Sequence, residues 1–73
     1  MTINKIPFSQ RDAEEMVTFA EAAEILRTAE GTLRWWRQRN EGPAFFRMGK
    51  RLYTTVGDLR QFMREQRLTH RKP

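Results

Sequence analysis

The chain has no cysteine, only one histidine and four glycines among its 73 residues, and no long apolar run. Without cysteine, neither a disulfide framework nor a thiolate metal site can supplement the core, so stability must come from packing and helix caps. No stretch approaches the ~18 apolar residues of a membrane span, and the first residues lack the charged and apolar segments of a signal peptide. We therefore expect a cytoplasmic protein.

Catalytic chemistry has little support either. The single histidine, His70, lies in a short basic tail, so no Ser/His/Asp or Cys/His arrangement can be assembled around it. Glu21 and Glu24 lie three residues apart, but no His or Cys accompanies them, so we interpret them as solvated helix residues and not as metal ligands. The glycines are too far apart for a phosphate-binding loop. The sequence predicts no enzyme, no catalytic residue, no metal and no cofactor.

Positive charge is abundant and lies mostly in the second half of the chain. Residues 1–33 carry three basic and six acidic side chains, a net charge of −3, whereas residues 34–73 carry eleven basic and three acidic ones, a net charge of +8. A surface charged only for solubility would mix the two signs. The segregation favours a polyanionic partner, with nucleic acid ahead of acidic protein or anionic lipid.

Two short helices are predicted in the middle of the chain. Thr18-Phe19-Ala20-Glu21 has the form of a capping box and predicts a helix over about 19–26. Its apolar residues recur at helical spacing and form one stripe toward the core: Phe19, Ala22, Ile25 and Leu26. After a break at 27–29, a second helix is predicted over about 30–39, ending at Asn40-Glu41-Gly42-Pro43. Two such helices with a tight turn form a helix-turn-helix pattern.

The two tryptophans of the second helix are predicted to face opposite ways. Leu33 and Trp36 lie three residues apart and share the buried side. Trp35 lies about 200° from Leu33 around the helical wheel, so it faces outward. An exposed tryptophan is costly without a partner. We interpret Trp35 as part of an interaction surface, toward either the DNA backbone or a neighbouring protomer.

A basic hairpin follows the second helix. Residues 44–48 and 51–55 predict two strands joined at Gly49-Lys50, a two-stranded wing with Phe46 and Met48 on one face. Basic residues gather near its tip, where they would contact phosphates or enter a minor groove: Arg47, Lys50 and Arg51.

The last predicted helix closes the core. Thr55-Val56-Gly57-Asp58 provides a cap and predicts a helix over about 56–68. Its apolar stripe consists of Leu59, Phe62 and Met63. The opposite side, with Arg60, Arg64 and Arg67, is interpreted mainly as a solvated basic face, with auxiliary phosphate contact or a protomer interface as alternatives. Near the N-terminus, residues 9–15 have the composition of one capped helical turn.

Several of these segments resemble a known group. The chain is similar to the phage excisionases and related small winged-helix DNA-binding proteins, kin of the mercury-resistance-type regulators. The similarity covers about 18–67 and is carried by Thr18-Phe19-Ala20-Glu21-Ala22-Ala23-Glu24-Ile25-Leu26, Thr32-Leu33-Arg34, Trp36-Arg37, Gly42-Pro43, Met48-Gly49-Lys50-Arg51 and Asp58-Leu59-Arg60-Gln61-Phe62.

The resemblance implies a mainly α fold with a small β-hairpin, a winged helix-turn-helix. Its second helix would enter the major groove, its wing would lie on the adjacent minor groove or backbone, and its last helix would pack behind. Excisionases of this kind bind tandem sites cooperatively and bend DNA so that a phage integrase excises instead of inserting. We expect an N-terminal arm with one short helix over 1–17, the DNA-binding domain over 18–68 and a disordered basic tail over 69–73.

The sequence departs from the pattern of this group at three places. Arg27-Thr28-Ala29 stands where a Gly-Val-Ser turn is common, and the lost hydroxyl cap costs ~1 kcal/mol unless Thr28 replaces it. Gly31 weakens the first turn of the second helix, and either permits close approach to DNA or is tolerated near a helix end. Thr54 stands where a larger apolar residue is frequent.

The predicted DNA-binding residues lie on the second helix and the wing. On the helix they are Glu30, Thr32, Arg34, Trp35, Arg37, Gln38 and Arg39, with Arg34 the best candidate for a guanine contact; on the wing they are Arg47, Lys50 and Arg51. The expected partners are double-stranded DNA, in the nucleoid of a bacterial host, further copies of the chain beside it and a phage integrase, with no membrane. The alternatives are a transcription regulator of the same fold and a protein-interaction adaptor or antirepressor with a hot spot at Trp35, Phe45 and Tyr53.

Overall fold

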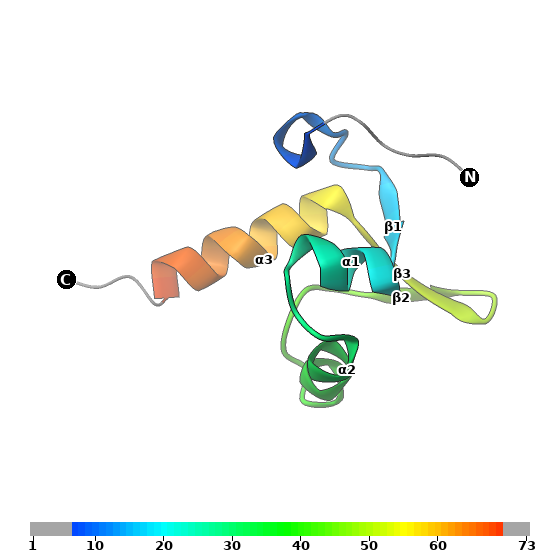
Figure 1. Ribbon diagram of the computed structural model, residues 1–73. Helices are drawn as coiled ribbons and strands as arrows, with labels where there is room; N and C mark the ends of the chain where they lie inside the picture. The colour runs from blue at the N-terminus through cyan, green and yellow to red at the C-terminus, as the bar shows by residue number, and fades with distance from the viewer. Residues whose placement is uncertain (1–6, 70–73) are drawn as a thin grey trace.

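The computed structural model of the protein describes residues 7–69 and places helices and strands close to the predicted positions (Figure 1). The elements in chain order are a 3₁₀ turn η1 (Phe8–Gln10), β1 (Met16–Thr18), α1 (Phe19–Ile25), α2 (Glu30–Gln38), β2 (Phe46–Met48), β3 (Arg51–Thr55) and α3 (Val56–Thr69). The three predicted helices and the hairpin are confirmed. The first hairpin strand begins two residues later than predicted. Thr69, predicted as the first residue of a disordered tail, is the last residue of α3, and the other tail residues, 70–73 with His70, lie outside the described residues.

The sheet has three strands instead of the predicted two. β1 pairs with β3 on the side opposite β2, which gives the antiparallel order β1-β3-β2. The pair Val17 and Thr54 lies at the centre of the β1–β3 ladder, and both side chains are buried. Because β1 has only three residues, it is too short to show the alternation of apolar and polar residues that marks a strand in a sequence. Its pairing is decided by the tertiary fold.

The segment before β1 forms two short turns and not a single helical turn over 9–15. The first is η1, and the second is closed by the Glu15 amide, which donates to the Asp12 carbonyl at 3.0 Å. Proline at position 7 and the extended backbone of Arg11 end η1 on both sides. The predicted helical character of this segment is thus confirmed only for Ser9 and Gln10.

The start of α1 is the predicted capping box. The Glu21 amide donates to the Thr18 hydroxyl oxygen at 3.1 Å, and the Glu21 carboxylate accepts from the Thr18 amide at 2.8 Å. Two amides that the helix cannot satisfy itself are therefore paired. Ala22 and Ala23 of α1 are buried, while Glu21 and Glu24 are exposed, as expected for the solvent side.

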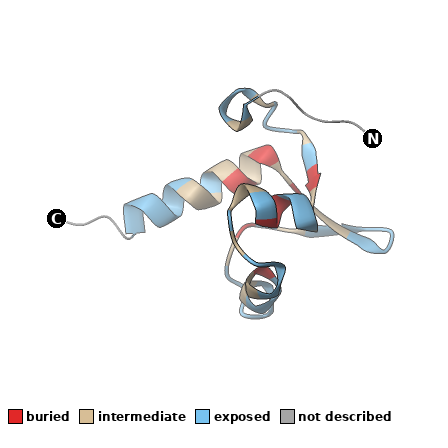
Figure 2. Cartoon of the chain, viewed as in Figure 1, coloured by how far each residue is buried: buried red, intermediate tan, exposed pale blue. Residues whose placement is uncertain are grey.

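The core is small and lies where α1, α2, α3 and the sheet meet (Figure 2). Its buried apolar residues are Val17, Ala22, Ala23, Leu33, Val56 and Leu59. Thr54 is fully buried among them, and its hydroxyl donates to the Ala44 carbonyl at 2.6 Å. A buried hydroxyl must be paired, and this hydrogen bond satisfies that requirement. Threonine is therefore tolerated at a position where the resemblance predicts a larger apolar residue.

α3 is capped as predicted and covers the core with its first half. The Asp58 amide donates to the Thr55 hydroxyl oxygen at 3.1 Å, and that hydroxyl donates to the Asp58 carboxylate at 2.9 Å. Leu59 is fully buried, whereas residues 64–69 are all exposed (Figure 2). Together with the helix pair and the hairpin, this arrangement is a winged helix-turn-helix, and the predicted fold class is confirmed.

The predicted solvated face of α3 is wrong for one of its three arginines. Arg64 and Arg67 are exposed, but Arg60 is half-buried and donates to backbone carbonyls of the N-terminal segment. The spacing of residues within α3 cannot reveal this contact, because its partners lie about fifty positions earlier in the chain.

Candidate nucleic-acid interface

The turn between α1 and α2 is built without the usual glycine and without a side-chain cap. Arg27 adopts a positive φ of 55°, a conformation that favours glycine. The residue before α2 is Ala29, and no side chain accepts from the amides of the first turn. The hydroxyl of Thr28 donates instead to the Leu26 carbonyl at 3.0 Å. Thr28 therefore does not replace the missing cap.

Contacts to the other helices define how α2 is oriented. Leu33 is buried, and the ring of Trp36 lies 5.7 Å from that of Phe62 on α3. The Arg34 guanidinium lies 5.5 Å from the ring centre of Phe19, at the start of α1. One side of α2 therefore faces α3, and another faces the first turn of α1. Trp36 is half-buried and Trp35 is 53% exposed, as their helical positions predicted.

A groove of about 430 Å³ separates the starts of α1 and α2 from the wing. It is lined by Thr18, Phe19, Ala20, Glu30, Arg34, Arg47, Lys50, Arg51 and Leu52. Four of these residues are cationic, one from α2 and three from the wing. Two separate parts of the chain thus direct positive charge to one concave surface, and within it only Glu30 is acidic.

The geometry of the hairpin explains how the wing reaches this groove. Arg47 and Leu52 are cross-strand partners, so their side chains share the sheet face that looks toward the groove. Lys50 occupies the turn together with Gly49, whose φ of 66° suits a residue without a Cβ. Arg47, Lys50 and Arg51 are all exposed, as a surface for a polyanion requires.

Within the groove, Arg34 pairs only weakly with Glu30. Their charged groups are 3.7 Å apart, and the two side chains are 62% and 51% exposed. An ion pair this open to water contributes roughly 0–1 kcal/mol, so little free energy opposes its replacement by another acceptor.

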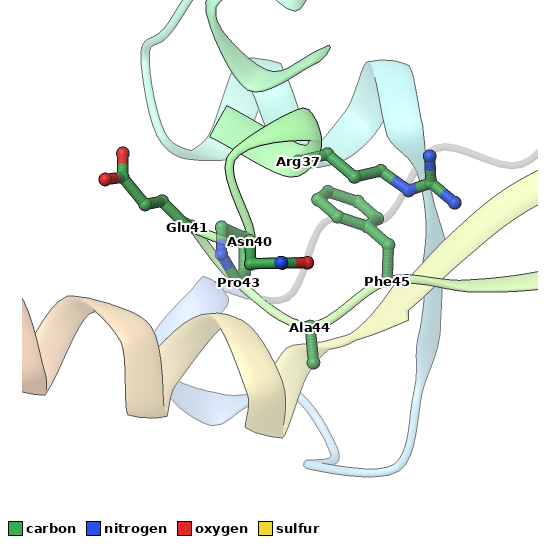
Figure 3. A pocket seen from close by; sticks show the side chains of 7 residues that line it. Arg37, Asn40, Glu41, Pro43, Ala44 and Phe45 are labelled. Atoms are coloured by element: carbon green, nitrogen blue, oxygen red, sulfur yellow. The ribbon is translucent and has the colours of Figure 1, made fainter. Parts of the chain in front are cut away.

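A second hollow of about 590 Å³ lies between the end of α2 and the start of β2 (Figure 3). Its lining is Arg37, Asn40, Glu41, Gly42, Pro43, Ala44 and Phe45. Figure 3 shows the Arg37 side chain extended alongside the ring of Phe45, with Glu41 pointing away from both. The Phe45 ring lies 5.0 Å from that of Phe19, which lines the first groove, so the two hollows are neighbours.

The end of α2 is held by two residues with positive φ, Asn40 at 59° and Gly42 at 82°. A Cβ at Gly42 would stand 3.2 Å from the Trp36 ring. Glycine is required here both by the backbone conformation and by the close packing. Gly31 is different, because it is exposed and nothing stands within 4 Å of a Cβ built on it.

The structure brings together only part of the predicted interface. Glu30, Arg34 and the three wing cations share the first groove, and Arg37 lies in the second. The linings of both hollows leave out Thr32, Trp35, Gln38 and Arg39. Of these, Arg39 is placed over the Trp35 ring at 4.6 Å and lies 3.4 Å from the Glu41 carboxylate.

Sequence reasoning missed other lining residues. Thr18 and Phe19 were interpreted only as a cap and as core, and Asn40 only as part of a helix stop. For Thr18 and Phe19 the resemblance could have indicated this position, since a winged helix places the first turn of its first helix beside the wing. Phe45 was singled out only as a strand residue and for the hot spot of the adaptor alternative. Its place in the second hollow follows from the path of the loop after α2.

A comparison with protein families finds a match. A family model described as a helix-turn-helix domain matches residues 16–67. The chain belongs to this helix-turn-helix family. Membership indicates DNA binding, and such domains are typically not enzymes. No curated protein and no solved structure matches the chain.

Helix-turn-helix domains in general place the second helix of the pair in the major groove. The second helix of this pair is α2. Within residues 7–69, no group of three or more His, Cys, Asp or Glu side chains is arranged to hold a metal. No helix in the same range is long and apolar enough to cross a membrane.

Proposed function

We propose that this helix-turn-helix protein is a sequence-specific, architectural DNA-binding protein of the excisionase type. α2 enters the major groove, and the wing formed by β2 and β3 lies on the adjacent minor groove or backbone. The groove that joins Arg34 to Arg47, Lys50 and Arg51 is the observation that carries the proposal. Cations from both elements on one concave surface suit a duplex, whose backbone runs continuously from one groove to the next.

Arg34 is the proposed base-reading residue. Its side chain is exposed on α2, and its pairing with Glu30 is weak enough to be exchanged for the two acceptors of a guanine. Phe19 lies under the guanidinium and limits its orientations before DNA arrives. Such preorganisation reduces the side-chain entropy that binding must otherwise overcome.

Arg37 and the wing cations are the proposed phosphate contacts. Arg37 lies alongside Phe45 in the second hollow, next to the groove (Figure 3). Lys50 lies in the hairpin turn and Arg51 directly follows it, and both exposed side chains are free to follow the DNA backbone. Contacts of this kind position the protein and carry no sequence information of their own.

Binding of several copies side by side is part of the proposal. One domain of this size covers too little DNA for high specificity alone. Trp35 and Arg39 lie outside both hollows, and Trp35 is 53% exposed, which leaves this side of α2 free for a neighbouring copy. The family includes excisionase-like DNA-binding proteins. In our proposal, copies bound side by side bend DNA and direct an integrase toward excision.

An adaptor that binds another protein is the alternative from a different class. It is favoured by exposed apolar side chains, namely Met16, Trp35, Phe46 and Met48. A transcription regulator of the same fold is the other alternative, and the arrangement of its binding sites would separate it from an excisionase.

Selection of bound duplexes from a randomised library tests all three functions. At about 150 mM salt, purely electrostatic binding is suppressed. Short, directly repeated sites are the result expected of an excisionase. A single or palindromic site would favour the regulator, and a lack of any enrichment would favour the adaptor.

Two substitutions test the division between reading and anchoring. Arg34→Ala should remove ~1–3 kcal/mol of discrimination at one base pair, because a bidentate guanine contact is lost. Lys50→Ala should weaken binding to all sequences about equally and lower the salt slope by ~1. Fluorescence anisotropy titrations at several salt concentrations measure both effects.

Arg67→Ala is the matched control, since it removes one exposed positive charge from α3, far along the chain from both hollows. It should leave sequence preference unchanged. If Arg34→Ala preserved sequence preference while Lys50→Ala abolished it, the assignment of reading to α2 and anchoring to the wing would be wrong.

A further inference from the structure

One side chain of α3 holds the N-terminal segment in place. A terminal nitrogen of Arg60, Nη2, lies 3.0 Å from the Phe8 carbonyl, 3.0 Å from that of Ser9 and 2.7 Å from that of Arg11. The guanidinium also lies 5.5 Å from the ring centre of Phe8. Three carbonyl oxygens around one cationic nitrogen form a strong local contact, because hydrogen bonds to charged groups are stronger than neutral ones.

The first turn of α3 makes two further contacts with the same segment. The Val56 amide donates to the Glu15 carbonyl at 2.9 Å, and the Gly57 amide donates to the Ala13 carbonyl at 2.8 Å. Amides in the first turn of a helix have no partner within the helix, so the segment supplies partners that water would otherwise provide. We call residues 7–15 the arm.

The arm carries its own internal brace. The Arg11 guanidinium and the Glu15 carboxylate are joined by two hydrogen bonds of 3.1 and 2.7 Å, and this pairing raises the pKa of Arg11. The same two residues supply carbonyls to α3, Arg11 to Arg60 and Glu15 to Val56, so the brace links these two contacts of the arm. The arm thus meets α3 as one ordered unit.

The arm continues directly into the sheet that carries the wing. Glu15 is followed by β1, which pairs with β3 through Met16–Thr55, Val17–Thr54 and Thr18–Tyr53. β3 is in turn the strand that pairs with β2 to make the wing. Thr18, the last residue of β1, also caps α1. β1 therefore joins the arm to the wing on one side and to the helix pair on the other.

The arm lies outside the part of the chain that the family shares. The family match begins at Met16, the first residue of β1, and so covers Arg60 but not its partners in the arm. The contact between Arg60 and the arm is for this reason an addition to the common helix-turn-helix core.

We propose that Arg60 is a positioning residue for DNA binding. By holding the arm on α3, it keeps β1 paired with β3 and so fixes the wing relative to α2. Arg60 itself makes no contact with DNA in the proposed complex, because its guanidinium is already paired with carbonyl oxygens of the arm. The effect on DNA rests on the proposed function, but the effect on the sheet does not.

Arg60→Gln is the first test, in the full chain. We expect DNA affinity to fall about three- to tenfold, the range for a residue that acts through packed neighbours. The salt slope should stay unchanged, whereas loss of a direct phosphate contact would lower it by ~1. Amide hydrogen exchange of the free protein should become faster in β1 and β3. Arg64→Gln, which removes an exposed arginine one turn further along α3, should change neither affinity nor exchange.

Gly57→Ala disturbs the contact between the arm and α3 at Ala13, without changing any charge. A Cβ at this position would stand 3.0 Å from the Ala13 carbonyl oxygen and 3.3 Å from the Ala13 Cβ, so the arm must shift. Alanine otherwise favours the helix. We expect the same weaker DNA binding, unchanged salt slope and faster exchange in β1 and β3. Because alanine favours the helix, these losses in Gly57→Ala could not be attributed to a less stable α3.

Three results would overturn the proposal. They are a lower salt slope for Arg60→Gln, unchanged affinity in both variants, or exchange that rises in the arm while β1 and β3 stay protected. If the native chain binds no DNA, the proposed function fails but the exchange measurement still decides whether Arg60 secures β1. The two failures are therefore distinguishable.

Discussion

The two helices of the helix-turn-helix pair are stabilised in different ways. α1 begins with a complete capping box, and the amide of Leu26, the residue after its last turn, donates back to the Ala22 carbonyl at 2.9 Å. α2 begins at Glu30, and the residue before it, Ala29, provides no side-chain cap. Two residues before Ala29, Arg27 has a positive φ. The start of α1 is thus secured by side chains next to it in sequence, whereas the start of α2 has no such support.

The difference follows from what each helix exposes. α1 buries two alanines against the core, whereas α2 buries only Leu33 fully and exposes most of its remaining length. Trp36 adds a second anchor through Phe62 and through the close approach of Gly42. A helix that leaves most of its surface exposed has few positions left for packing, so each of those positions must carry more of its stability.

Leu33→Ala should break this arrangement most severely. Removing a fully buried leucine costs about 2–4 kcal/mol, which approaches the whole stability expected of a domain this small. Urea unfolding followed by circular dichroism measures the loss. Leu68→Ala, at a site that is 63% exposed on α3, should change stability by less than about 0.5 kcal/mol. Equal losses in the two variants would contradict the view that α2 depends on Leu33.

Gly42→Ala should have the next largest effect. The substitution forces a Cβ into a conformation with φ of 82° and within 3.2 Å of the Trp36 ring, at a cost of about 1–3 kcal/mol. Thermal unfolding tests this expectation. Gly31→Ala is the comparison, because its site is open and helical, and there alanine should stabilise by up to ~1 kcal/mol. If Gly31→Ala also weakened DNA binding, the glycine would be needed for close approach.

The capping difference predicts opposite effects at the two helix starts. Thr18→Ala should cost ~1 kcal/mol, because the Glu21 amide loses its acceptor. Ala29→Ser should stabilise the protein by about 0.5–1 kcal/mol, because it supplies the acceptor that α2 lacks. Chemical unfolding of both variants under the same conditions gives the comparison. A neutral result for Ala29→Ser would mean that the first turn of α2 gains nothing from a hydroxyl.

The cations that line the first groove were predictable, because charge and period are local properties. Arg34, Arg47, Lys50 and Arg51 were predicted from a basic helix and a basic hairpin, and they share one groove. The orientation of Trp35 was predicted from helical period alone. Arg39 lies outside the linings of both hollows, beside Trp35 and Glu41, and helical period did not predict these contacts. Its role in DNA binding stays a prediction.

The sequence by itself determined the features that depend on neighbouring residues. The caps at Thr18 and Thr55, the three helices, the hairpin and the unequal tryptophans each follow from spacings of a few positions, over which backbone geometry is regular.

Only the tertiary structure decided the features that join distant segments. These are the pairing of β1 with β3, the burial of Thr54 against the Ala44 carbonyl, the shared groove of α2 and the wing, and the hold of Arg60 on the arm. A hydrogen bond across fifty residues leaves no periodic pattern in a sequence. It forms because folding brings its donor and acceptor together and excludes the water that would otherwise pair with them.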